Sequence, residues 1–445
     1  MEMLLVASET GTAEAFARRL HSLLRRRGLL LDCRTLDETV PLADVRLAIF
    51  LVSTTGDGQV PTSMVRAWTA LRQASLPADL LQDMKFAIFG LGDSSYQHFN
   101  AASRKVRARL MQLGAKELCD AGVSDDQSEP EVLFNIWMEK KLLPGLGLDP
   151  KLPLAPLELP TRKYSVMTAP LNFVLAELAP PVTSVVVNAR LTRLDWQQDV
   201  RHIELAPSPL LSFQAGDVCY ITPSNAPAGG GALKTFLNTR LDVDPDQPVK
   251  FNPPHPFLPD GITPRSACEE FLDMLGVPHA DFFECASFFC SNQDERERML
   301  ELADGIGYTD YCRRELRSTV QVLLDFPSCA LPFAYLIQLV GKIRPRGFSI
   351  ASSPMYHGNS IHLTVAVVRH LTPNKIWRSG VCSTWLASQK PGASISRIEV
   401  RSGTLALPKS LSTPLILIGP GTGMAPMRSL IFQVRLSFYE FLQKV

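Results

Sequence analysis

Three loops rich in Gly, Ser and Thr follow three apolar segments near the start of the chain, and this pattern constrains the fold most strongly. The apolar segments are Met3–Ala7, 46–52 and 85–90, and the amphipathic segments that alternate with them are 13–27, 62–73 and 100–113. Alternation of short strands with helices is typical of a doubly wound parallel sheet that carries helices on both faces. We therefore predict a doubly wound α/β domain over residues 1–146.

Composition excludes several classes of protein. A chain of 445 residues is long enough for two or three domains. The 45 Lys and Arg residues almost balance the 44 Asp and Glu residues, which gives no field for nucleic acid or an anionic membrane. The nine cysteines are scattered without a CxxC pair or a Cys/His cluster, so we expect reduced thiols and no metal site. The chain has no apolar run of membrane-spanning length and no signal peptide at its start, which predicts a cytoplasmic protein.

Prolines mark the end of the first domain and predict a linker over 147–177, because proline removes backbone donors and favours extended chain. Beyond it, five segments have the pattern of antiparallel strands: Val182–Leu191, His202–Leu205, Asp217–Thr222, Arg346–Ser352 and Ile361–Arg369. They flank a stretch at about 227–340 in which 268–276, 294–304 and 332–341 are predicted helices. We predict an antiparallel β-barrel with a helical insertion over 178–408.

The first loop of the α/β domain has the chemistry of a phosphate site. It consists of Ser8, Glu9, Thr10, Gly11, Thr12 and Ala13, between the first strand and the first helix. Unpaired amides at a helix N-terminus and nearby hydroxyls suit a phosphate, and the absence of Lys excludes a Walker-type loop. One terminal monophosphate fits best, and a simple N-cap is the alternative.

Two further loops follow the second and third strands, and their polar residues are candidates for the same site. The candidates are Ser53, Thr54, Thr55 and Gly56 in the second loop, and Leu91, Gly92, Asp93, Ser94, Ser95, Tyr96, Gln97, His98, Phe99 and Asn100 in the third. Ligands of open α/β sheets bind outside the carboxyl ends of the strands, so the loops converge on one crevice. Tyr96 is the natural stacking partner for a planar ring.

The barrel contains two segments that could hold a larger nucleotide. In the first, Arg346, Gly347, Phe348 and Ser349 combine a guanidinium, an aromatic ring and a hydroxyl on one extended segment. In the second, Gly380, Val381, Cys382 and Ser383 begin a helix and offer amides to a phosphate. Taken singly, an ordinary strand and an ordinary capped helix explain them equally well.

A third α/β unit is predicted to begin at 409. Leu415–Ile418 has the pattern of a buried strand, and Gly419-Pro420-Gly421-Thr422-Gly423 follows it as a glycine turn before a helix. Residues 428–445 amount to one helix, and one strand with one helix cannot bury both faces of a sheet. We therefore expect this third domain, 409–445, to be incomplete.

The motifs together resemble those of the diflavin reductases. SETGTA, STTGDG and GLGDSSYQHF are similar to the FMN loops of flavodoxin-like domains, RPRGFSIASS with GVCSTW resembles the FAD signature of ferredoxin-reductase-type barrels, and GPGTGMAP resembles an NADPH loop. The resemblance implies FMN at the three loops and near Asp126, FAD at Arg346 to Ser349 and Gly380 to Ser383, and NADPH beside Thr422. An acidic cluster of Asp120, Asp125, Asp126, Glu129 and Glu131 is either solvated or helps to dock a basic partner.

The resemblance also implies a function. RPRGFSIASS, GVCSTWLAS and LVSTTGDG resemble the small members that serve cytosolic iron–sulfur assembly. In these, electrons pass from NADPH through FAD and FMN to an iron–sulfur protein such as anamorsin. No side-chain nucleophile or general base is needed, and we predict no catalytic residue. Two alternatives remain: a truncated, non-catalytic flavin-binding form that competes for the acceptor, and a relative of methionine synthase reductase or cytochrome reductase.

Overall fold

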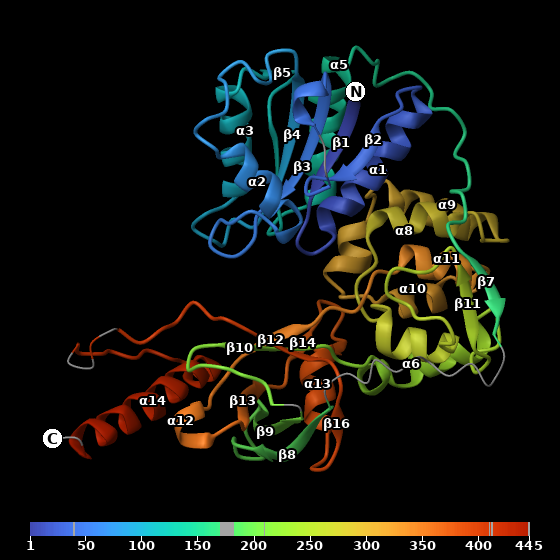
Figure 1. Ribbon diagram of the computed structural model, residues 1–445. Helices are drawn as coiled ribbons and strands as arrows, with labels where there is room; N and C mark the ends of the chain where they lie inside the picture. The colour runs from blue at the N-terminus through green and yellow to red at the C-terminus, as the bar shows by residue number, and fades with distance from the viewer. Residues whose placement is uncertain (39–40, 170–181, 209, 409, 411–412, 444–445) are drawn as a thin grey trace. The chain divides into compact units, whose positions relative to one another are not determined.

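The computed structural model describes residues 1–38, 41–169, 182–208, 210–408, 410 and 413–443. The chain divides into two compact units, which are shown in Figure 1 and described here one at a time. The first unit consists of Met1–Pro160 and His279–Tyr311, and the second of Thr161–Pro278 and Cys312–Val445. Part of the predicted helical insertion therefore groups with the N-terminal domain.

A parallel sheet forms the centre of the first unit. Its strands are β1 (Glu2–Ala7), β2 (Asp32–Thr35), β3 (Leu47–Ser53), β4 (Lys85–Gly92), β5 (Lys116–Glu117) and β6 (Gly122–Asp125). They are ordered β2-β1-β3-β4-β5, β6 also pairs with β4, and all of these pairs are parallel. This is the strand order of the flavodoxin-like doubly wound sheets, so the predicted fold class is confirmed.

Both faces of the sheet are covered by helices, as the apolar runs of the strands require. The helices are α1 (Thr12–Arg26), α2 (Val65–Leu71), α3 (Ala101–Gln112), α4 (Pro130–Trp137) and α5 (Leu143–Gly145). Successive side chains of a strand point to opposite faces. Accordingly, Leu4 of β1 packs in the layer that contains Phe16 of α1, whereas Leu5 packs in the layer that contains Val106 of α3.

Helices α8 (Ala280–Ser287) and α9 (Gln293–Ala303) complete the first unit. The second of them confirms the helix predicted at 294–304. Polar contacts join α1 to α8: Arg18 forms an ion pair of 2.5 Å with Asp281, and the Ser22 hydroxyl donates to the Glu284 carboxylate at 2.7 Å. Burial raises the pKa of Glu284 and is the main cause of its shift.

Antiparallel sheets form the barrel of the second unit. Its strands are β7 (Ser165–Thr168), β8 (Val182–Arg190), β9 (Val200–Ser208), β10 (Val218–Ile221), β11 (Val249–Asn252), β12 (Arg346–Ser349), β13 (Ile361–Ala366), β14 (Arg369–Leu371), β15 (Trp377–Ser379), β16 (Ser394–Ile395) and β17 (Ile398–Arg401). One sheet has the order β13-β9-β8-β16 and another β12-β10-β17. Side chains from both, including Ile203, Leu363 and Cys219, pack in one buried cluster. The predicted antiparallel FAD-type domain is thereby confirmed.

The helices of the second unit are α6 (Ala226–Thr239), α7 (Pro264–Ser266), α10 (Thr319–Asp325), α11 (Phe333–Leu339), α12 (Pro354–His357), α13 (Val381–Ser388) and α14 (Met424–Gln443). The helix α11 confirms the helix predicted at 332–341. The helix predicted at 268–276 is wrong in extent, because its helical turn ends at Phe271. Leu272 is extended and forms a bridge with Lys342, so pairing with a distant segment overrides the local periodicity.

Two other predictions are corrected by strand pairing. The stretch 147–177, predicted as a linker, contains β7, which pairs with β11; residues 170–177 and the predicted barrel start at 178 lie outside the described residues. Leu415–Ile418 is not a strand: it has no assigned sheet partner, and the side chains of Ile416 and Ile418 are 88% and 76% exposed. Without a neighbouring strand among the described residues, its apolar pattern does not produce a sheet.

Candidate functional site

A cavity of about 320 Å³ lies at the carboxyl ends of β1, β3 and β4, where the three predicted loops meet. It is lined by Thr10, Thr12, Ser53, Thr54, Thr55, Gly56, Leu91, Gly92, Asp93, Tyr96, His98, Phe99, Asn100, Ser124, Asp126 and Pro130. The volume is within the range typical of small-molecule sites. The cavity thus brings together most of the residues that the sequence assigned to FMN.

Hydrogen bonds within the first loop and to Ser63 fix the conformation of this loop. Gly11 has a left-handed backbone (φ 86°), which favours glycine, and its N–H donates to the Ser8 hydroxyl at 2.8 Å. Ser63 holds the other side of the loop, since its hydroxyl accepts from the Ser8 N–H at 2.8 Å and donates to the Ser8 carbonyl at 2.9 Å. The hydroxyls of Thr10 and Thr12 remain on the cavity wall.

Glu9 has a structural part in this loop. Its carboxylate accepts hydrogen bonds from the N–H and the hydroxyl of Thr62, at 2.8 and 3.0 Å. The Glu9 N–H in turn donates to the Ser53 hydroxyl at 3.3 Å. The Glu9 carboxylate therefore points to the loop that contains Thr62, and Glu9 is not among the residues that line the cavity.

Replacement of Ser63 by alanine tests whether its hydrogen bonds fix the first loop. We expect Ser63→Ala to weaken FMN binding by about five- to thirtyfold, because each of the two lost hydrogen bonds costs about 1 kcal/mol. Fluorescence titration of FMN into flavin-free protein gives the Kd. Thr69→Ala is the matched control, since the Thr69 hydroxyl donates to the Val65 carbonyl of its own helix. An unchanged Kd for Ser63→Ala would contradict the assignment.

The second and third loops are fixed by hydrogen bonds to each other and to β6. Thr55 and Gln59 exchange two backbone hydrogen bonds around a tight turn. Asp93 accepts from the N–H of Ser95 and from the Gln127 side chain, both at 2.9 Å, and the bonds from Ser95 lower its pKa. The Ser94 N–H donates to Asp125 at 3.0 Å, which likewise lowers the pKa of Asp125. These carboxylates are therefore ionised and shape the loops.

Asn100 provides a test of whether a ligand fits the cavity. Its side chain is 2% exposed, and its Nδ2 donates to the Ser124 carbonyl at 3.1 Å. Its Oδ1 is buried and has no hydrogen-bond partner within the described structure. A buried acceptor without a donor is costly, and a polar ligand group or water beside it would remove that cost. The lining therefore fits a polar mononucleotide such as FMN.

The remaining predicted FMN residues have other places in the structure. Ser8, Glu9, Gly11 and Ala13 form the frame of the first loop, and Ser94, Ser95 and Gln97 are exposed on the third loop outside the cavity lining. The structure adds Ser124 and Pro130 to the lining, both in the segment around Asp126 where the sequence resemblance implied a contact. Ser124 lies on β6, and only the pairing of β6 with β4 brings it to the cavity.

The acidic cluster does not act as one exposed patch. Glu131 is only 7% exposed, and Asp120 forms an ion pair of 2.6 Å with Lys141. Asp125 accepts backbone hydrogen bonds from the loops, and Asp126 lines the cavity. The acidic residues therefore differ in burial and in their hydrogen-bond partners, and each has a separate structural position.

In the second unit, β12 places the arginine–aromatic–serine segment against β10. Arg346 lies opposite Ile221 and Phe348 opposite Cys219, and both of these partners belong to the buried cluster. Phe348 is partly buried against this cluster. On the other face, the ring of Tyr220 lies so close to Gly347 that an added Cβ would be 3.2 Å from it. Tyr220 therefore packs against this segment, a contact that the sequence did not indicate.

The first turn of α13 is the second predicted FAD segment. The Ser383 hydroxyl is already used, because it accepts from the Val368 N–H at 3.0 Å and contacts the Gly380 carbonyl at 3.3 Å. Cys382 is buried in the barrel, which raises the pKa of its thiol to about 12. The buried Oγ1 of Thr384 has no partner among the described residues. The backbone amides that begin α13 are the groups of this turn that suit a phosphate.

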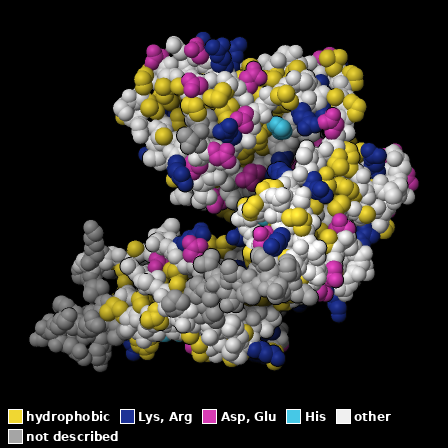
Figure 2. Space-filling view, turned by 45° about the vertical axis from the view of Figure 1, so that its right-hand side comes forward, with side chains coloured by type: hydrophobic (Ala, Val, Ile, Leu, Met, Phe, Trp, Pro, Cys, Tyr) yellow, Lys and Arg dark blue, Asp and Glu magenta, His cyan; other side chains and the backbone are white. Residues whose placement is uncertain are grey.

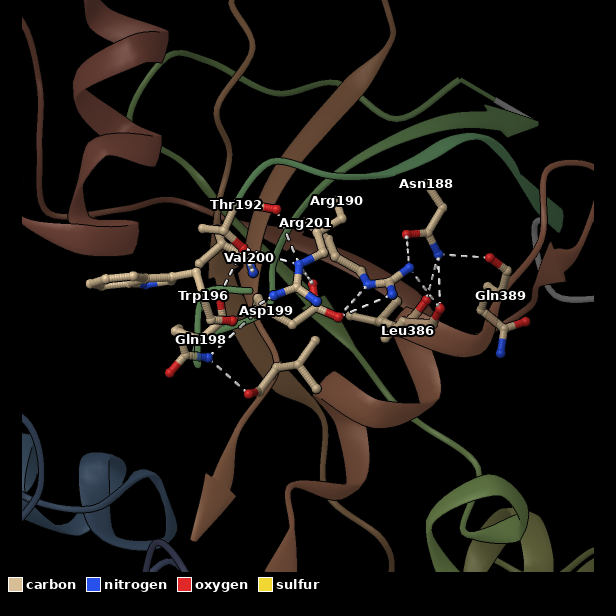
Figure 3. A network of polar contacts seen from close by, with 12 residues as sticks. Asn188, Arg190, Thr192, Trp196, Gln198, Asp199, Val200, Arg201, Leu386 and Gln389 are labelled. Carbon is tan, nitrogen blue, oxygen red and sulfur yellow. Dashed lines mark hydrogen bonds and ion pairs between the residues drawn. The ribbon is translucent and has the colours of Figure 1, made fainter. Parts of the chain in front are cut away.

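A polar network holds the opposite end of α13 (Figure 3). The Asn188 side chain donates to the carbonyls of Leu386 and Gln389 at 2.9 and 2.7 Å. Arg201 reaches the same helix end, and Asp199 pairs with both Arg201 and Arg190. Asn188 and Arg201 thus satisfy carbonyls that have no partner within the helix.

We expect Asn188→Ala to destabilise the second unit by about 1–3 kcal/mol, because it removes the side-chain donor to the Gln389 carbonyl and one of the two donors to the Leu386 carbonyl. Thermal unfolding followed by FAD fluorescence measures the effect. Asn374→Ala, at an exposed position in the β14–β15 turn, is the control and should leave the midpoint unchanged. Equal midpoints for the two variants would show that the network does not support α13.

The glycine turn predicted before the last helix is present. Gly421–Gly423 forms one turn that leads into α14, and Thr422 lies in its middle. An added Cβ on Gly419 would lie 2.6 Å from the Gly423 carbonyl oxygen, so this close approach requires glycine. The turn predicted from the sequence therefore forms, although the strand predicted before it does not.

The charges of the surface are mixed. Figure 2 shows acidic and basic side chains interspersed on the visible face, in keeping with the net charge of +1. Among the described residues, no helix combines the length and hydropathy needed to cross a membrane.

Comparison with known families follows the two units along the chain. Residues 4–137 match the flavodoxin family, and residues 177–385 match the FAD binding domain family. A flavodoxin domain joined to an FAD-binding domain defines the class: a flavoprotein oxidoreductase with one domain for FMN and one for FAD.

Individual relatives narrow the class. The chain is 37% identical to NADPH-dependent diflavin oxidoreductase 1 of Mus musculus, over 96% of this chain and 78% of the relative. Identity to the protein of the same name is 36% in Bos taurus, with the same coverage, and 33% in Dictyostelium discoideum, over 98% of this chain and 74% of the relative. The chain belongs to this family of diflavin oxidoreductases.

Proposed function

We propose that this chain passes electrons from NADPH through FAD and FMN to an iron–sulfur protein in cytosolic iron–sulfur cluster assembly. The acceptor would be of the anamorsin kind, and the protein would act in the cytoplasm. The observation that carries the proposal is the cavity at β1, β3 and β4 in a chain that also has an FAD-type barrel. When bound, the flavins supply hydride acceptance and single-electron release, and the protein binds and orients them.

We assign the binding roles as follows. The amides at the start of α1 and the hydroxyls of Thr10 and Thr12 hold the FMN phosphate, within the frame formed by the rest of the first loop. Asn100 supplies a buried acceptor. Tyr96, which is 65% exposed at the rim of the cavity, covers the ring. In the second unit, Arg346 and the first turn of α13 hold the FAD diphosphate. Thr422 lies at the turn assigned to NADPH.

The experiment uses purified protein under anaerobic conditions. Flavin extraction should yield one FMN and one FAD, and NADPH should reduce both flavins and then a [2Fe–2S] acceptor of the anamorsin kind. Absence of either flavin would overturn the two-site reading. Reduction of both flavins without electron transfer to the acceptor would overturn the assignment of the partner.

A second candidate function is a flavin-binding form that occupies the acceptor and oxidises NADPH poorly. It is favoured by Leu415–Ile418, the segment before the glycine turn, which has no assigned sheet partner and is exposed. We expect the nicotinamide of NADPH to be poorly positioned at a turn that follows such a segment. Flavin reduction by NADPH should then be much slower than in the Mus musculus relative. Stopped-flow absorbance measures the rate, with photoreduction of the flavins as the control. Rates equal to those of the relative would exclude this candidate.

A further inference from the structure

A compact group of metal-ligating side chains lies on the barrel sheet, beside the end of the arginine–aromatic–serine segment, where the Ala351 N–H donates to the His362 carbonyl at 2.7 Å. His202 and Glu204 are two residues apart on β9, so they point to the same face, and His362 of β13 lies directly opposite Glu204. His202 Nε2 is 2.8 Å from Glu204 Oε1, and His362 Nε2 is 3.9 Å from the same oxygen. All three potential ligand atoms lie within 4.8 Å of one another.

We propose that His202, Glu204 and His362 form a binding site for a divalent transition-metal ion such as Zn²⁺. Two imidazole nitrogens and one carboxylate oxygen are a donor set that Zn²⁺ takes in proteins. Bonds of about 2.0 Å place tetrahedral ligand atoms about 3.3 Å apart. The observed separations bracket this value, so small side-chain rotations suffice, and water or the Ser360 hydroxyl, 3.1 Å from His362 Nε2, takes the fourth position.

The protonation states suit a cation. Burial is the main cause that lowers the pKa of His362 to about 4, so its ring is neutral near pH 7. The hydrogen bond from His202 lowers the pKa of Glu204, which is therefore a carboxylate. Neutral imidazole and ionised carboxylate are the forms that bind metals. The side chains of His202 and Glu204 are 19% and 27% exposed, which leaves a path for the ion from solvent.

Arg428 of α14 is the group that opposes a metal ion here. Its Nη1 lies 3.4 Å from His362 Nδ1 and also donates to the Ala351 carbonyl. Metal binding at Nε2 requires the proton of the neutral ring to be on Nδ1, where it faces this guanidinium. Removal of the Arg428 charge should therefore strengthen metal binding, which a purely structural histidine cluster would not show.

The test is calorimetric titration of Zn²⁺ into the flavin-loaded protein. All samples carry Cys33→Ser, because an exposed cysteine thiol is a competing ligand type for zinc. We expect one Zn²⁺ per chain, and an affinity lowered by more than about tenfold in Glu204→Gln and in His202→Asn. Arg428→Gln should bind several times more tightly. His370→Asn, at an exposed position on β14, is the matched control and should bind as the parent does.

Flavin content and circular dichroism show whether each variant is folded, and Glu204→Gln keeps the size of the side chain that it replaces. Saturable binding that is lost in Glu204→Gln and His202→Asn but kept in His370→Asn supports the site. Absence of saturable binding, or equal affinities in the parent and both ligand variants, would overturn it.

Discussion

Gly90→Ala is expected to give a protein that keeps FAD and loses most of its FMN. Gly90 lies at the end of β4, where an added Cβ would be 2.6 Å from Asn100 Oδ1 and 2.8 Å from the Ser103 Cβ. Both neighbours are buried, so the new methyl group must displace the start of α3, which carries Asn100 into the cavity. Overpacking of this kind costs about 1–3 kcal/mol. If that strain acts on the FMN-bound conformation, FMN affinity falls by about five- to more than a hundredfold.

The FMN-to-FAD ratio after heat extraction, determined by chromatography, is the measurement. Gly341→Ala is the matched control, since an added Cβ at Gly341 would have nothing within 4 Å and its backbone is not left-handed. We expect the control to retain both flavins in equal amounts. An equal ratio in Gly90→Ala would show that α3 adjusts without disturbing the cavity.

Arg346→Ala is expected to have the opposite effect, with FAD lost and FMN kept. Charged hydrogen bonds contribute about 1.5–3 kcal/mol, so removal of the guanidinium should weaken FAD binding by about ten- to more than a hundredfold. The FAD affinity of Arg346→Lys should lie between those of the parent and Arg346→Ala. Lysine keeps the charge but lacks the planar guanidinium that binds a diphosphate through two hydrogen bonds.

Arg193→Ala is the control for this variant, because the Arg193 side chain is 86% exposed and pairs with Asp195 in a surface ion pair. Thermal unfolding separates a binding defect from a folding defect, since Arg346 also offsets the charge of Asp273, whose pKa burial raises. If Arg346→Ala retained FAD as tightly as Arg193→Ala does, the arginine–aromatic–serine segment would not be the diphosphate site.

Local patterns predicted the α/β domain well because its signals are short-range. The strands β1, β3 and β4 are continuous apolar runs in the sequence. Each is followed directly by a loop rich in Gly, Ser and Thr. The carboxyl ends of parallel strands lie at the same edge of the sheet, so the loops that follow them lie close together. This is why Thr10, Thr54 and Asp93 were correctly brought to one cavity from sequence alone.

The errors occur where pairing between distant segments decides the conformation. Leu272 leaves its predicted helix to pair with Lys342, and Ser165–Thr168 becomes a strand only because β11 lies beside it. Leu415–Ile418 shows the converse, since a strand pattern without a neighbouring strand stays unpaired.

The sequence by itself determined the order of the domains, the three mononucleotide loops and the glycine turn, since each depends on residues close together in the chain. The tertiary structure alone decided which hydroxyls are already used within the protein, such as that of Ser383, which accepts from the Val368 N–H. It also brought His362 beside His202 and Glu204 across two antiparallel strands. Hydrogen-bond partners and strand register depend on contacts between remote segments, and these are fixed only when the whole chain has folded.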